Sequence, residues 1–308
     1  MLTAPSFHHL HLNSVDPDAA IDFYTEQFAT TSRTTWGGLP ALQSPNDVLV
    51  LFTRVPSRPA TSPQTAIWHF GWHAVDARAA METYKARPGV KLLPFYTGDE
   101  ERTVLISSDT WSGTGGILGR TQAQVAEAKA TGLEPSRTGG FAYMEGPDDA
   151  LVEYAGNFPA ERFNHVHMFQ EDPFCAQLWY QQHLNASPLS SQTGPAPLTE
   201  ATCKVARGLD RSFPALEAQG LIRTPSAGVI FGDVAFPWYM RQGDEPLVGT
   251  RGHLYDHFAL SVTDLDGWLD KLRNEGVSVL EEPYQLGDTR AAMIGGPSQE
   301  AIELVEVR

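Results

Sequence analysis

Four segments of the chain repeat one pattern of apolar and polar positions. Each has a histidine in a short apolar run that is typical of a strand, and an aspartate follows seven residues later. The segments are HLHLNSVD (9–16), HFGWHAVD (69–76), HVHMFQED (165–172) and HFALSVTD (257–264). The aspartate stands where a helix N-cap belongs, and apolar residues with helical spacing follow it. The pattern therefore predicts a strand and then an amphipathic helix in each of four repeated units.

The ends of these units are of two kinds. GPDDALVEY (146–154) and GPSQEAIEL (296–304) each have a Gly-Pro turn and then an apolar strand that carries one glutamate. SPNDVLVLF (44–52) and FGDVAFPWY (231–239) have no glutamate at the equivalent place. We expect each unit to contain a strand, a helix and three further strands, over residues 5–54, 66–157, 162–241 and 253–308. Insertions at 109–140 and 185–226 interrupt this scheme.

The composition narrows the classes of function. The chain has 308 residues, of which 42% are hydrophobic, so it can bury a large core. Its formal net charge of −15 repels phosphate backbones and anionic lipid, which makes nucleic acid and membranes poor partner candidates. No apolar run is long enough to span a bilayer and the N-terminus lacks the pattern of a signal peptide, so we expect a cytoplasmic protein. Cys175 and Cys203 are accordingly expected to be two buried thiols.

The histidines of the opening strands are candidate metal ligands. Side chains two residues apart in a strand share a face, so His9 and His11 project together, as do His165 and His167. A single strand histidine is more often a hydrogen-bonded core residue, and duplicated repeats can inherit a residue without a present role. A histidine at the same position of all four units nevertheless favours a shared purpose.

Two glutamates strengthen the metal hypothesis. Glu153 and Glu303 have apolar neighbours in the sequence, where an unpaired carboxylate is costly to bury. A metal ion or an arginine partner would remove that cost. Two histidines and one carboxylate form the facial triad of non-haem Fe(II) sites, and the same ligands suit Zn, Mn, Ni or Co. The candidate sets are His9, His69 and Glu153, and His165, His257 and Glu303. Beside them, His11 and His167 are each a candidate base, an additional ligand or a hydrogen-bonding neighbour of a ligand.

These motifs resemble those of the vicinal oxygen chelate superfamily, which includes glyoxalase I, extradiol dioxygenases and bleomycin-resistance proteins. The resemblance rests on the four openings, with FYTEQF (23–28) and WYQQHL (179–184), and on the two Gly-Pro closing strands. It implies an α+β fold of four βαβββ modules that form two cupped mixed β-sheet units. It also implies an N-terminal domain over 1–158 and a C-terminal domain over 159–308. Family members pair modules 1 with 2 and 3 with 4, or 1 with 4 and 2 with 3; the second pairing exchanges His9 and His165 between the sets.

The resemblance further implies a metal-dependent enzyme whose small-molecule substrate presents two adjacent oxygens to the ion. Chain size, module number and the ligand set are similar to those of the extradiol dioxygenases, so Fe(II)-dependent cleavage of a catechol-like molecule is favoured. Tyr143, ten residues before Glu153, matches an active-site tyrosine of those enzymes, whereas Met293 has the equivalent position before Glu303. The candidate catalytic residues are therefore His11, Tyr143 and His167.

Two departures from the family keep other activities open. The dioxygenases have an additional acid–base histidine on a middle strand, and this chain has none between His11 and His69 or over 184–252. Glyoxalase I has a second glutamate where this chain has Leu51. The alternatives are a redox-neutral lyase or isomerase with Zn, Ni or Mn, and a metal-free protein that binds a small molecule. The sequence leaves homo-oligomerisation open.

Two further signals have an ordinary structural explanation. Trp68, Trp72 and Trp111 would suit an aromatic substrate pocket, although packing in the core is the default for such residues. The glycine-rich GTGGILGR (113–120) lacks the ending of a phosphate-binding loop, so a turn or a lid is favoured.

Overall fold

The computed structural model describes residues 2–93, 130–131, 141–156, 158–189, 194–206, 212–215, 219–222 and 225–307. The glycine-rich segment 113–120 and Trp111 lie outside the described residues, as does nearly all of the insertion at 109–140. Within the described part of the chain, no helix is both long enough and apolar enough to cross a membrane.

The first two units have the expected order of strands and helices, and we call them modules 1 and 2. The elements of module 1 are β1 (Ser6–Ser14), α1 (Pro17–Gln27), β2 (Ser32–Trp36), β3 (Leu39–Gln43) and β4 (Leu49–Arg54). Those of module 2 are β5 (Ile67–His73), α2 (Ala77–Ala86), β6 (Lys91–Leu93), β7 (Phe141–Glu145), the 3-10 turn η1 (Pro147–Asp149) and β8 (Leu151–Ala155). Both modules open with a histidine strand that leads into a helix, as the repeat predicts.

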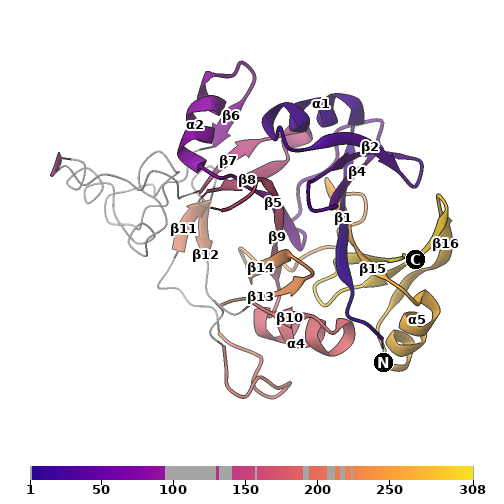
Figure 1. Ribbon diagram of the computed structural model, residues 1–308. Helices are drawn as coiled ribbons and strands as arrows, with labels where there is room; N and C mark the ends of the chain where they lie inside the picture. The colour runs from indigo at the N-terminus through magenta and orange to yellow at the C-terminus, as the bar shows by residue number, and fades with distance from the viewer. Residues whose placement is uncertain are drawn as a thin grey trace.

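Modules 3 and 4 repeat the same order (Figure 1). Module 3 contains β9 (Arg162–Gln170), α4 (Pro173–Leu184), β10 (Ser187–Pro188), β13 (Ser226–Phe231) and β14 (Val234–Met240). Its insertion carries a separate hairpin of β11 (Ser212–Ala215) and β12 (Gln219–Ile222). Module 4 contains β15 (Tyr255–Val262), α5 (Leu265–Asn274), β16 (Val279–Leu286), β17 (Thr289–Gly295) and β18 (Ala301–Glu306). The α+β fold of four βαβββ modules is confirmed.

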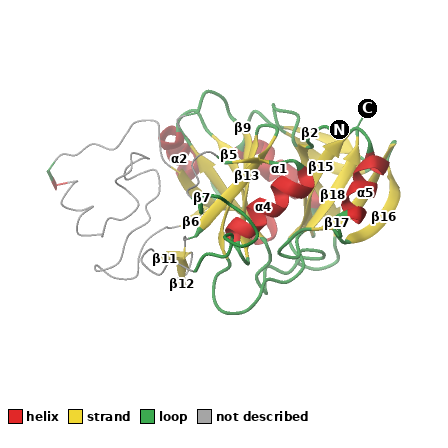
Figure 2. Cartoon of the chain, turned by 90° about the horizontal axis from the view of Figure 1, so that it is seen from below, coloured by secondary structure: helices red, strands yellow, loops and turns green. Residues whose placement is uncertain are grey.

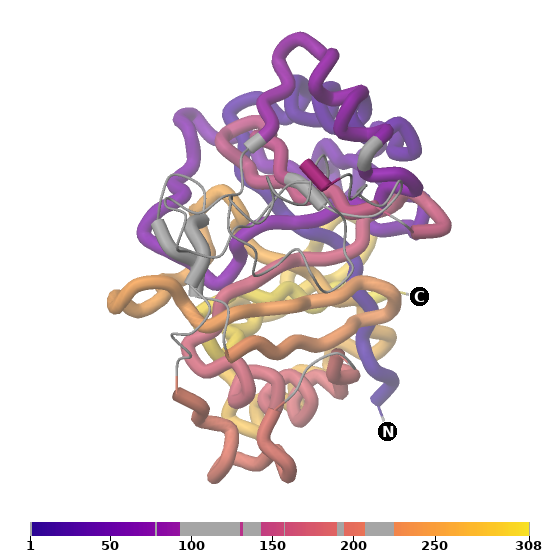
Figure 3. The backbone as a smooth tube through the Cα atoms, turned by 90° about the vertical axis from the view of Figure 1, so that its left-hand side faces the viewer, coloured from indigo at the N-terminus to yellow at the C-terminus, as the bar shows by residue number. Residues whose placement is uncertain are grey.

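The strands form two mixed eight-stranded sheets, and each sheet combines two modules that are not both in one half of the chain. The sheet of modules 1 and 4 has the order β16-β17-β18-β15-β1-β4-β3-β2, and that of modules 2 and 3 has β10-β13-β14-β9-β5-β8-β7-β6. Figure 3 shows the strands of modules 2 and 3 running side by side across the front of the molecule. The sheets therefore do not follow the expected division into 1–158 and 159–308, since each half contributes one module to each sheet.

Alternation along the strands separates two faces of each sheet. His9 and His11 point to one face of β1, whereas Leu10 and Leu12 belong to the buried core. Phe7 also belongs to this core, because an irregularity of β1 between Phe7 and His9 shifts the alternation by one residue. The core faces of the two sheets pack together, with the Phe7 ring stacked on Phe163 at 5.5 Å between centroids. Figure 2 shows α1 and α4 in the middle of the molecule with strands on either side. The histidine faces are consequently turned away from this shared core.

The sheet of modules 1 and 4 curls until the hairpins at its two ends meet. A Cβ atom on Gly287, between β16 and β17, would lie 2.8 Å from the Cα atom of Gly37, between β2 and β3. Both glycines have positive φ angles, of 59° and 58°. Two backbones approach this closely only where neither residue carries a side chain. The contact encloses the histidine face of this sheet.

Cys175 and Cys203 are joined by a disulfide bond, which differs from the expected pair of thiols. The bond links α4 to the segment 194–206 of the module 3 insertion. Gly194 of this segment also packs on Phe174, since an added Cβ would lie 2.4 Å from that ring. The pairing was not visible in the sequence because the two residues come together only when the insertion folds back on α4.

Candidate metal centres

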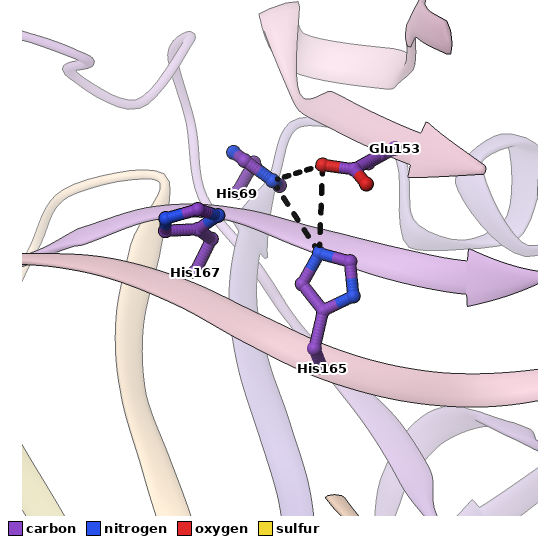
Figure 4. A group of neighbouring side chains, drawn as sticks. All are labelled: His69, Glu153, His165 and His167. Carbon is purple, nitrogen blue, oxygen red and sulfur yellow. Dashed lines mark hydrogen bonds and ion pairs between the residues drawn. The ribbon is translucent and has the colours of Figure 1, made fainter. Parts of the chain in front are cut away.

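The first centre lies on the sheet of modules 2 and 3 and is formed by His69, Glu153 and His165 (Figure 4). Adjacent strands hold the three side chains: β5 carries His69, β8 carries Glu153 and β9 carries His165. His69 Nε2 lies 3.1 Å from Glu153 Oε2 and 3.5 Å from His165 Nε2. The remaining separation, from His165 Nε2 to Glu153 Oε2, is 3.7 Å.

These separations fit three ligands of one divalent ion. Two atoms that each lie about 2.1 Å from an ion, in tetrahedral or octahedral geometry, are about 3.0–3.4 Å apart. His167, two residues after His165, belongs to the same group, whose potential ligand atoms all lie within 4.8 Å of one another. The centre thus has the two-histidine, one-carboxylate set, with another histidine beside it.

Burial and charge prepare these side chains to bind a cation. Burial lowers the pKa of His69 to about 4, although the nearby Glu153 carboxylate acts in the opposite direction. Burial also tends to raise the pKa of Glu153, but interactions with His165 and His69 outweigh it and hold this pKa well below its usual value. Near neutral pH, His69 is therefore a neutral imidazole and Glu153 a carboxylate, which are the forms that bind metal ions.

Gly71 makes room for His165. The two residues are partners in the register of β5 and β9, and the imidazole lies over the glycine backbone. A Cβ atom on Gly71 would lie 1.9 Å from His165 Cε1, which is far inside van der Waals contact. The absence of a side chain at Gly71 is therefore a condition for the observed place of this ligand.

Tyr143 fixes the carboxylate of the first centre. It lies opposite Glu153 in the β7–β8 ladder, and its hydroxyl donates a hydrogen bond of 2.8 Å to Glu153 Oε2. The sequence predicts Tyr143 as a residue of the site, and in the structure its hydroxyl contacts the candidate ligand Glu153. Met293 has the corresponding position opposite Glu303 and offers no such donor.

The second centre lies on the sheet of modules 1 and 4 and is formed by His9, His257 and Glu303. Glu303 Oε2 lies 3.3 Å from His9 Nε2 and 4.0 Å from His257 Nε2. All three atoms are buried, and none has a hydrogen-bond partner in the part of the chain that the structure describes. Three buried Lewis-basic atoms that face one another without hydrogen bonds fit a cation between them, because burial without a partner is otherwise costly.

The surroundings of the second centre differ from those of the first. Tyr284 of β16 donates a hydrogen bond to Glu303 Oε1, on the side away from the histidines. Burial raises the pKa of Glu303, in contrast to the lowered pKa of Glu153. His11 lies beside the centre with its ring 4.5 Å from that of His257, and its Nε2 is 2.8 Å from Thr53 Oγ1.

A β-bulge precedes each of the four ligand histidines. The registers of β1 with β15 and of β5 with β9 each skip two residues, and the four skipped residues are His8, Trp68, Asn164 and Asp256. A bulge turns the extra residue toward its neighbour instead of letting it alternate to the other face. Asn164 Oδ1 and Asp256 Oδ1 consequently contact Nδ1 of His165 and His257, and His8 Nδ1 lies 2.8 Å from His9 Nδ1.

These Nδ1 contacts set the orientation of the ligands. A histidine that donates its Nδ1 proton presents the lone pair of Nε2 to a metal ion. The Asp256–His257 contact is 2.6 Å, and Asp256 also accepts from Gly252 N and lies 3.0 Å from Arg251 Nε. Burial tends to raise the pKa of Asp256, but its hydrogen bond to His257 helps to keep this pKa below the usual value. Asp256 is therefore an ionised acceptor for His257.

The closing strands of modules 1 and 3 have no carboxylate at the position that Glu153 and Glu303 have in modules 2 and 4. Glu303 of β18 pairs with Ala259, two residues after His257. The equivalent residue of module 1 is Leu51 of β4, which pairs with His11, two residues after His9. In module 3 the corresponding residue is Pro237, one residue before the Trp238–Met168 pair. Within the described part of the chain, each set therefore offers three candidate ligands.

The structure brings together all six proposed ligands, but in an exchanged arrangement. His9 joins His257 and Glu303, whereas His165 joins His69 and Glu153, because modules 1 and 4 share a sheet and modules 2 and 3 share the other. Relative to the sets His9, His69, Glu153 and His165, His257, Glu303, the two histidines His9 and His165 have changed places, as the second of the two module pairings left open by the sequence requires. Sequence reasoning missed Gly71, Asp256 and Tyr284. Of these, only Asp256 carried a local signal, as an acidic residue directly before a repeated histidine.

Comparisons with known proteins agree with this fold. The family model described as Glyoxalase/Bleomycin resistance protein/Dioxygenase superfamily matches residues 162–304, which include most of modules 3 and 4. No curated protein matches the chain. The crystal structure of glyoxalase I from Zea mays is similar with a TM-score of 0.63 and 15% identity, over 98% of this chain and 92% of that one.

A second solved structure has the same fold. A putative dioxygenase from Bacillus subtilis is similar with a TM-score of 0.57 and 9% identity, over 99% of this chain and 86% of that one. The sequence match over residues 162–304 and the fold of the whole chain are consistent with the glyoxalase/bleomycin resistance protein/dioxygenase superfamily, the vicinal oxygen chelate proteins.

Proposed function

We propose that the protein is a divalent-metal enzyme that cleaves a catechol-like small molecule with O2, with Fe(II) as the favoured metal. The observation that carries this proposal is the convergence of His69 Nε2, His165 Nε2 and Glu153 Oε2 to within 3.1–3.7 Å of one another. Two histidines and one carboxylate with open positions are the ligand set of non-haem Fe(II) oxygenases. The missing second carboxylate, at Pro237, favours this set over the two-glutamate arrangement expected for glyoxalase I.

The residues of the first centre would have three different roles: binding the ion, orienting a ligand and accepting a proton. His69, His165 and Glu153 would hold the ion, which supplies a Lewis acid with free positions for two adjacent substrate oxygens. The Tyr143 hydroxyl holds the Glu153 carboxylate in place through its 2.8 Å hydrogen bond. His167 belongs to the same cluster, and in this proposal it would accept the proton of a substrate hydroxyl.

The first centre suits catalysis better than the second. The Glu153 side chain is 13% exposed and that of His165 is 10% exposed, whereas those of Glu303 and His9 are 4% and 0% exposed. A substrate therefore has closer access to the first set of ligands. The lowered pKa of Glu153 and raised pKa of Glu303 also favour cation binding at the first centre.

The test combines metal content with oxygen consumption. We expect protein purified anaerobically without chelator to contain iron by elemental mass spectrometry, and to consume one O2 per catechol-type substrate cleaved. Glu153→Ala should lose one equivalent of metal and all turnover, since it removes the one carboxylate that the described residues bring to that centre. Glu145→Ala is the matched control, because Glu145 lies on the neighbouring strand and pairs with the exposed Lys91 instead.

The other outcomes decide against the proposal in distinct ways. Turnover that proceeds equally without O2, in protein that holds zinc, nickel or manganese, would establish a redox-neutral lyase or isomerase. Protein that takes up no metal ion but binds small molecules tightly would be a binding protein. Unchanged metal stoichiometry in Glu153→Ala would refute the ligand assignment itself.

A further inference from the structure

Trp68 differs in kind from the three residues at the equivalent bulge positions. His8, Asn164 and Asp256 each present a polar atom to Nδ1 of the following ligand histidine. Trp68 makes no such contact, and Nδ1 of the buried His69 has no hydrogen-bond partner among the described residues. A buried polar atom without a partner is costly to the fold. The first centre therefore carries an aromatic ring at a position where the other strands have a hydrogen-bonding group.

The bulge brings this ring to the metal-binding face. In a regular strand Trp68 and His69 would point to opposite sides, but the register of β5 with β9 skips Trp68. The indole consequently lies against the His69 ring, with 4.2 Å between centroids and an interplanar angle of 73°. It also lies 5.1 Å from the ring of His167. Trp68 is thus beside both a ligand and the candidate base.

Other aromatic rings extend this surface. Trp68 is stacked with Phe169 at 5.0 Å and with Tyr143 at 6.2 Å, at interplanar angles of 28° and 30°. Tyr143 and Phe169 are buried, but Trp68 is only partly buried. An indole that remains partly exposed next to a metal ligand, with its neighbours covered, is available to a molecule bound at the centre.

We propose that Trp68 selects the substrate of the first centre by packing against a flat, unsaturated group that carries the two adjacent oxygens. This inference rests on the proposed function of that centre as a site for such oxygens. A molecule held beside His69 also lies beside the indole, because the two rings are in contact. Flat rings stack on an indole better than puckered saturated rings do, and an aromatic pair contributes about 0.5–1.5 kcal/mol beyond the buried area.

The second centre has a charged residue at the position that Trp68 has in the first centre. Its equivalent residue, Asp256, is an ionised carboxylate that contacts His257 and Arg251. A charged group there offers no surface for a flat apolar ring, so selection of this kind belongs to the first centre alone.

A pair of ligands with the same chelating group separates binding to the metal ion from packing against the indole of Trp68. Mandelate and hexahydromandelate are both α-hydroxy acids, and they differ only in a flat phenyl or a puckered cyclohexyl ring. Titration calorimetry on the Zn²⁺-loaded protein should show that mandelate binds about fivefold more tightly, the factor that stacking of this strength gives. Trp68→Leu should bring the ratio of the two dissociation constants close to one while zinc stays bound.

Two further variants complete the design. Trp68→Asp installs the residue that the second centre has at this position, and should likewise abolish the preference while it binds zinc at least as tightly. Trp36→Leu makes the same change as Trp68→Leu beside His9, where the Trp36 ring lies 5.7 Å away, and should keep the wild-type preference. The Asp variant keeps the test valid if the Leu variant does not fold.

The outcomes distinguish this inference from the proposed function. Equal affinities in the wild-type protein, or a preference that persists in either folded Trp68 variant, would overturn the role of Trp68 and leave the metal centre intact. A zinc-loaded protein that binds neither ligand would contradict the proposed function, and the inference with it.

Discussion

At the scale of single residues, the geometry of the first centre requires that Gly71 has no side chain. His165 reaches the space shared with His69 and Glu153 only because its imidazole crosses the backbone of Gly71. In the other sheet the partner of His9 is Ala259, which already carries a Cβ atom. The two ligand histidines therefore have different steric requirements although they occupy equivalent strands.

We expect Gly71→Ala to lower metal affinity at the first centre by about 10- to 100-fold, the range seen when the support of a ligand is lost. The added Cβ, 1.9 Å from His165 Cε1, forces this ring away from the other two ligands. Competition with a fluorescent chelator measures the change. Ala259→Gly is the matched control and should leave metal affinity at the first centre unaltered; equal affinities in the wild type and Gly71→Ala would refute the steric argument.

At the scale of elements, the turn between β17 and β18 joins module 4 to module 3. Glu300 of this turn is fully buried and accepts hydrogen bonds from Tyr180 Oη at 2.5 Å, Gln170 Nε2 at 3.0 Å and Ser298 N at 2.8 Å. The GPSQE segment therefore forms a turn and also anchors module 4 to module 3 through the Glu300 carboxylate. Burial raises the pKa of Glu300 above the ordinary value of 4.5, although these donors act against the rise.

This pKa predicts a dependence of stability on pH. The folded chain keeps the Glu300 proton to a higher pH than the unfolded chain does, so folding is favoured by this group at low pH. The contribution is lost as the pH rises from about 4.5 through the folded-state value. The free energy of unfolding of the wild type minus that of Glu300→Gln, from urea titrations, should fall over this range. A difference that stays constant or rises would contradict the argument.

At the scale of the whole molecule, both candidate metal centres combine residues from the two halves of the chain. His9 is completed by His257 and Glu303, and His165 is completed by His69 and Glu153. Strand pairing of β1 with β15 and of β5 with β9 brings these residues together. Among the described residues, neither half of the chain contains a complete set of candidate ligands.

Pairs of substitutions test this arrangement by metal stoichiometry. If the wild type binds two equivalents, His9→Ala with Glu303→Ala should retain one, because both changes affect the same centre. His9→Ala with Glu153→Ala should retain none, because each change removes a ligand from a different centre. The opposite result would show that modules 1 and 2 share a sheet in solution. Each single variant, which should lose one equivalent, serves as the reference.

The sequence by itself determined the repeated units and the candidate metal ligands within them. Strand alternation, the helix that follows each aspartate and the Gly-Pro turns are local patterns, so they could be followed along the chain for all four modules. The same patterns identified His9, His69, His165, His257 and the two glutamates. The six residues could be chosen because their type and place in the repeat do not depend on distant contacts.

Tertiary structure alone decided which of these residues meet. The open edge of one opening strand is chemically similar to that of another, so local sequence does not specify whether β1 pairs with β5 or with β15. The side on which Trp68 lies depends on a bulge that exists only in the ladder with β9. The space over Gly71 and the Cys175–Cys203 bond likewise arise from segments that fold back on one another. Contacts between distant segments form only in the folded chain, and they assign each ligand to its centre.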